Sequence, residues 1–119
     1  MALLDAMQQM HCDFIDCITA RANDAYKLSR SGLLNNDQRQ LFSSKAASLR
    51  EAAEELFDED FHDDTDSFKK CVNDLATVNT QVQASIDALN DAATRAADVA
   101  TLLKLFDQAL AIAASVAPK

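Results

Sequence analysis

Hydrophobic residues recur every three or four positions along most of the chain, which is the spacing of one helix face. The first such stripe is Leu3, Met7, Met10, Phe14, Ile18, Ala22, Ala25 and Leu28. Polar residues occupy the opposite side, so the pattern predicts an amphipathic helix over residues 2–30. Gly32 follows it, and this only glycine of the chain stands where a left-handed residue would end a helix.

A second helix is predicted over residues 36–57. Asn35 and Gln38 have the spacing of a capping box, in which each side chain accepts a hydrogen bond from the other residue's backbone N–H. Leu34 precedes them as a candidate hydrophobic staple. The apolar stripe of this helix is Phe42, Ala46, Leu49, Ala53 and Leu56.

The third helical stretch covers residues 65–117. Its apolar positions alternate steps of four and three, which is the heptad seam of a coiled coil. The first half of the seam is Phe68, Val72, Leu75, Asn79, Val82, Ile86 and Leu89. The second half, which we predict to be an oligomer seam, is Val99, Leu103, Phe106, Leu110 and Ala113. Asn90 and Asp91 are the one stop and start signal within the stretch.

These elements predict an all-α fold, an antiparallel and coiled-coil-like helical bundle forming a single domain over residues 1–119. Two arrangements fit. Either residues 65–117 form one long third helix whose second half is covered by another copy of the chain, or a break near 90–91 gives a four-helix up-and-down bundle. The alanine-rich sequence around Ala92 and Ala96 favours the unbroken helix, and hence a homodimer.

Residues 109–117 are apolar on nearly every helix face, so we expect protein to cover them. They do not predict a membrane span, because the apolar run is short and Lys104 and Asp107 lie just before it.

Charge is unevenly distributed. The chain has 19 acidic and 11 basic residues, for a net charge of −8, and residues 51–66 contain nine acids and no lysine or arginine. Such acidity disfavours nucleic acid as a partner, because binding to phosphates depends on lysine and arginine. Glu54 and Glu55 lie near a predicted helix C-terminus, where negative charge is unfavourable. We predict a partner-binding acidic patch of Glu51, Glu54, Glu55, Asp58, Glu59, Asp60, Asp63 and Asp64.

Few residues of the sequence have a spacing that suggests metal binding or catalysis. Glu59 and His62 match the Glu-x-x-H spacing of di-iron bundles, but the motif occurs once and in a predicted connection. The aspartates around it lack the glycine and the bidentate glutamate of a calcium loop. We therefore expect no metal, no cofactor and no catalytic residue. Three cysteines, Cys12, Cys17 and Cys71, are an odd set that suits a reducing, cytoplasmic location.

The sequence therefore favours a non-enzymatic protein–protein interaction module, such as a small cytosolic adaptor, chaperone or inhibitor. Helix-face packing and the acidic patch would bind a basic protein partner. The main alternative is a structural homo-oligomerisation module. A metal-binding helical bundle and a membrane-active helical protein are less favoured.

Overall fold

The described residues form four helices, which are arranged as two helical hairpins, and they contain no strand. The computed structural model describes the backbone of residues 2–58 and 65–116, and the side chains of residues 13–56 and 69–115. The helices are α1 (Ala2–Leu28), α2 (Asn36–Asp58), α3 (Thr65–Ala88) and α4 (Arg95–Val116). The bounds of α1 and α2 agree with the sequence prediction to within two residues.

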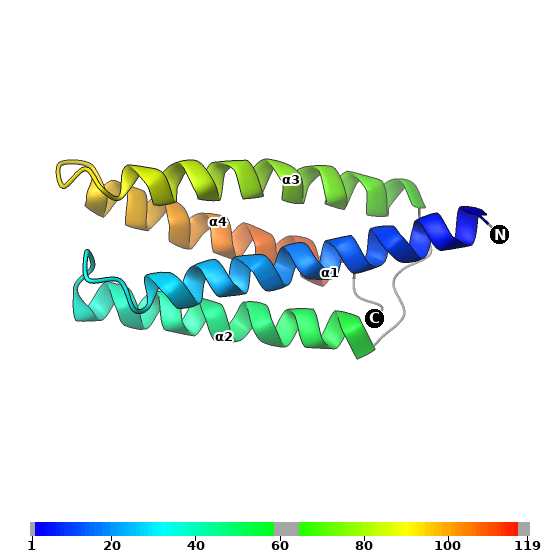
Figure 1. Ribbon diagram of the computed structural model, residues 1–119, viewed down its shortest axis with the longest axis horizontal. Helices are drawn as coiled ribbons and strands as arrows, with labels where there is room; N and C mark the ends of the chain where they lie inside the picture. The colour runs from blue at the N-terminus through cyan, green and yellow to red at the C-terminus, as the bar shows by residue number, and fades with distance from the viewer. Residues whose placement is uncertain (1, 59–64, 117–119) are drawn as a thin grey trace.

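The two hairpins lie side by side and form an elongated bundle of 52 × 22 × 20 Å (Figure 1). Helix α1 packs mainly on α2, and α3 packs mainly on α4. Contacts between α2 and α4 hold the hairpins together, whereas α1 and α3 touch only sparingly. The helices alternate in direction along the chain, so the two neighbours α2 and α4 run parallel (Figure 1).

Of the two arrangements predicted, the four-helix bundle is confirmed, and the single helix over residues 65–117 is wrong, because α3 ends at Ala88 and α4 begins at Arg95. The break falls at the Asn90–Asp91 signal. The Asp91 carboxylate accepts a hydrogen bond from the Ala93 N–H at 3.0 Å, and the Arg95 guanidinium donates to the Leu89 carbonyl at 2.8 Å. Alanine favours helix by less than about 1 kcal/mol per residue, and the burial gained when α4 folds back exceeds that preference.

The capping box at the start of α2 is confirmed. The Gln38 N–H donates to Asn35 Oδ1 at 2.8 Å, and the Asn35 N–H donates to Gln38 Oε1 at 3.0 Å. Leu34 beside it is buried. The left-handed conformation expected at Gly32 is wrong, because its φ is not positive. Tight turns end α1 instead, with the N–H groups of residues 30 and 31 bonded three residues back.

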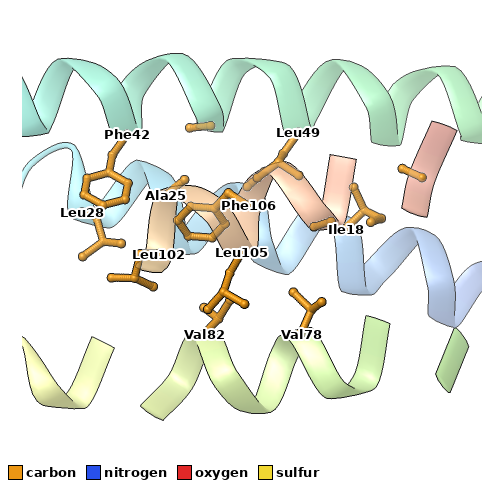
Figure 2. Packing of buried hydrophobic residues seen from close by; sticks show 14 of the residues in the cluster. Ile18, Ala25, Leu28, Phe42, Leu49, Val78, Val82, Leu102, Leu105 and Phe106 are labelled. Atoms are coloured by element: carbon orange, nitrogen blue, oxygen red, sulfur yellow. The ribbon is translucent and has the colours of Figure 1, made fainter. Parts of the chain in front are cut away.

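The core runs along the centre of the bundle (Figure 2). Within the core the rings of Phe42 and Phe106 meet edge to face, with centroids 5.9 Å apart. The predicted stripes of α1 from Phe14 onward and of α2 as far as Leu56 are buried as expected. The buried face of α4 is broader than predicted, because α4 contacts three other helices. Its buried residues are Val99, Leu102, Leu105, Phe106, Ala109 and Ala113.

Candidate interaction surfaces

The acidic patch begins on the last turns of α2. Glu51, Glu54 and Glu55 are exposed and lie on one side of the helix, since they are spaced by three and four residues. No hydrogen bond or ion pair joins their carboxylates to another described residue. Asp58 is the last residue of α2. The other predicted members, Glu59, Asp60, Asp63 and Asp64, lie outside the described residues.

The position of Glu54 and Glu55 is electrostatically unfavourable for the helix. The last turn of α2 contains no basic residue. Carboxylates there face the negative end of the helix dipole, and like charges three or four residues apart repel one another. Helix stability therefore does not explain why these residues are acidic.

The opposite end of the α1–α2 hairpin is basic. A shallow polar groove there is lined by Tyr26, Ser29, Arg30, Asn36, Arg39, Gln40 and Ser43. Arg30 lies over the Tyr26 ring, 5.7 Å from its centroid, and donates to the Tyr26 hydroxyl at 3.1 Å. Arg39 donates to Asn36 Oδ1. Neither guanidinium is paired with a carboxylate of a described residue. Sequence analysis missed this groove, although residues 21–50 contain six bases and two acids.

A small cavity of about 140 Å³ lies between α1 and α3, two helices that contact each other only sparingly. Its lining is mostly apolar and consists of Asp13, Phe14, Cys17, Val72, Leu75, Ala76 and Asn79. The Asn79 amide oxygen is buried without a hydrogen-bond partner in the described structure. The signal for this feature was in the sequence, because Asn79 is the one polar residue in the first half of the heptad seam.

Most of the predicted oligomer seam lies inside the chain's own core. Val99, Phe106 and Ala113 are buried against the other helices, while Leu103 and Leu110 are half-buried. Within residues 109–115 the chain itself covers only part of the helix surface, with Ala109 and Ala113 buried, and the expectation that protein covers the rest stays a prediction. Ala111 and Ala114 are exposed, because only one side of α4 faces the bundle. Because α4 folds back onto the bundle, most of the residues of the predicted seam pack against other helices of the same chain.

The described residues offer little metal or thiol chemistry. They contain no group of three or more His, Cys, Asp and Glu side chains placed to hold a metal ion. The Glu59–His62 motif lies outside them. Cys17 and Cys71 are free thiols, and Cys71 Sγ lies 3.2 Å from Ser115 Oγ of α4. None of the helices, over the part of the chain that is described, is both long and apolar enough to cross a bilayer.

The chain was compared with known protein families, curated proteins and solved structures, and nothing matches it. The class defined by the structure is an all-α helical bundle. The functional argument therefore depends on the surfaces of the bundle.

Proposed function

We propose that the chain is a non-enzymatic protein–protein interaction module of the reducing cytoplasm, such as an adaptor, chaperone or inhibitor. Its acidic patch binds a basic protein. The main support is the set of exposed carboxylates of Glu51, Glu54 and Glu55 near the C-terminal end of α2, which form no ion pair with another described residue. The free thiols of Cys17 and Cys71 support the reducing location.

The physical argument starts from the unfavourable position of these charges. A carboxylate near a helix C-terminus destabilises the helix by about 0.3–1 kcal/mol, so a role outside the fold explains it better. Complementary charges on two proteins accelerate their encounter and select the partner. The nearest base in the sequence, Arg50, is exposed and makes no ion pair with a described acid, so the patch is available to a partner.

The test is a quantitative pull-down with the full chain at rising salt. We expect a basic protein that is retained at about 0.05 M salt and lost near 0.5 M, where screening acts over only a few ångströms. A triple variant, Glu51→Gln with Glu54→Gln and Glu55→Gln, should lose this protein. The matched control, Asp16→Asn with Asp37→Asn and Asp74→Asn, removes the same charge from exposed sites elsewhere and should keep it.

Binding of the captured protein is then measured with purified components. The proposal fails if no basic protein distinguishes the triple variant from its control. It also fails if the affinity of the purified pair is unchanged between low and high salt.

Homo-oligomerisation is the second candidate function. Half-buried Leu103 and Leu110 on α4 support it, because they leave apolar area for a second copy to cover. Val99, Phe106 and Ala113 contribute less than the sequence predicted, since the chain already buries them. Self-association that disappears in a Leu103→Ser and Leu110→Ser double variant would favour this function.

A further inference from the structure

The outward side of α2 carries opposite charges at its two ends. Arg39 lies near the start of the helix, beside Arg30 of α1, in the polar groove. Glu51 and Glu54 lie near its end, and all of these groups lack a partner of opposite charge among the described residues. Helix α2 forms one edge of the bundle, with α1 and α4 as its neighbours (Figure 1). Its outer side is therefore open to another molecule.

The spacing of the charges is suited to a copy of the same helix. Arg39 and Glu54 are fifteen residues apart, which is about 22 Å along α2 and about 60° around its axis. Of the exposed residues between them, Ser43, Ala47 and Arg50 lie on the same side of the helix. Because the distance between packed helices depends on the side chains at the contact, the small Ser43 and Ala47 permit close approach near the middle of this stretch.

We propose that a second copy of the chain docks on this face, with the two α2 helices antiparallel and a two-fold axis crossing near Ala47. In that arrangement Arg39 of each copy lies level with Glu54 of the other. A two-fold interface repeats every contact, so one complementary pair produces two ion pairs. Charge complementarity fixes the antiparallel direction, because parallel helices would bring like charges together.

The inferred dimer shares Glu54 with the proposed partner site, so self-association and partner binding compete for it. Arg39 belongs to the dimer face alone. An Arg39 variant therefore separates the two ideas, since it should lose the dimer and still capture the basic partner. Failure of the partner proposal would leave the dimer test unaffected.

The test is charge reversal followed by sedimentation equilibrium of the full chain. Salt near 0.15 M screens repulsion between the two net negative chains beyond about 8 Å, while touching pairs still interact. Arg39→Glu and Glu54→Arg should each weaken dimerisation roughly tenfold or more, because each places like charges together at both contacts. The controls Lys27→Glu and Asp74→Arg make equal charge changes at exposed sites outside the face.

Two further samples make the test specific. An equimolar mixture of the Arg39→Glu and Glu54→Arg proteins should form a heterodimer, because both of its contacts then join opposite charges. The double variant carrying both changes should form a homodimer again. The inference is overturned if the wild-type chain stays monomeric at hundreds of micromolar. It is also overturned if neither sample restores association, or if the dimer depends on Leu103 and Leu110 instead.

Discussion

Asn79 is the polar member of an otherwise apolar stripe on α3. Leu75 and Val82, one turn before and one turn after it, are buried in the core. The Asn79 amide oxygen is buried as well and has no hydrogen-bond partner in the described structure. A buried polar atom left unpaired destabilises the folded state by about 1–3 kcal/mol. This residue therefore weakens the region where α1 and α3 already pack loosely.

Replacing Asn79 by leucine should stabilise the chain, because leucine has a similar size and no polar atom to desolvate. We expect Asn79→Leu to raise the free energy of unfolding by about 1–2 kcal/mol in urea denaturation. Asn73→Leu is the control, since Asn73 is exposed on the same helix and the gain there should be only a few tenths of a kcal/mol. Equal effects of the two substitutions would mean that the buried amide is not the cause.

At the scale of one element, the start of α2 shows what local sequence determines. Asn35 and Gln38 form the capping box that their spacing predicts, with both hydrogen bonds made. Both residues lie within a run of four consecutive positions, so no long-range packing is needed to bring their side chains and N–H groups together. Capping signals of this kind are therefore readable without a structure.

Removing the cap should loosen the first turn of α2. We expect Asn35→Ala to lower the free energy of unfolding by about 0.5–2 kcal/mol, because the Gln38 N–H loses its acceptor. Asn36→Ala should have a smaller effect, since the Asn36 side chain bonds only the exposed end of Arg39. Thermal unfolding followed by circular dichroism measures both. Similar losses in the two variants would contradict the role of the cap.

Helix α4 shows where local patterns fail. The heptad spacing selected Leu103 and Leu110, yet Leu102, Leu105 and Ala109 are the residues buried beside Phe106. A heptad describes a narrow seam against one partner helix, whereas α4 contacts three helices and buries a wider face. Which side of an apolar helix faces inward depends on its neighbours, and the sequence does not show them.

For the whole molecule, the sequence predicted the class of fold but favoured the wrong arrangement of its second half. The stop signal at Asn90–Asp91 was visible, and alanine propensity outweighed it in the prediction. The acidic patch was readable from composition because it is contiguous in sequence. The basic groove was not, since Arg30 and Arg39 come together only when α1 and α2 form a hairpin. A site that is formed by two elements can be recognised only when the fold is known.

The fold-back of α4 can be tested by a disulfide cross-link. In this structure Cys71 Sγ lies 3.2 Å from Ser115 Oγ, whereas an unbroken helix would place these residues about 66 Å apart. With Cys12→Ser and Cys17→Ser as background, Ser115→Cys should therefore form an intramolecular disulfide with Cys71 under mild oxidation. Thr101→Cys, about 21 Å away along α4, is the control and should stay reduced.

Non-reducing electrophoresis and intact mass distinguish the two arrangements. A monomer of increased mobility and a mass loss of about two hydrogens are expected only if α3 and α4 form a hairpin, since a disulfide needs Cα atoms within about 7 Å. Cross-linked dimers, or unreacted thiols in the Ser115→Cys protein, would instead support the long helix. The result decides whether the buried side chains of α4 have their partners within one chain, and therefore whether Leu103 and Leu110 are the only seam residues left for a second copy among those that are described.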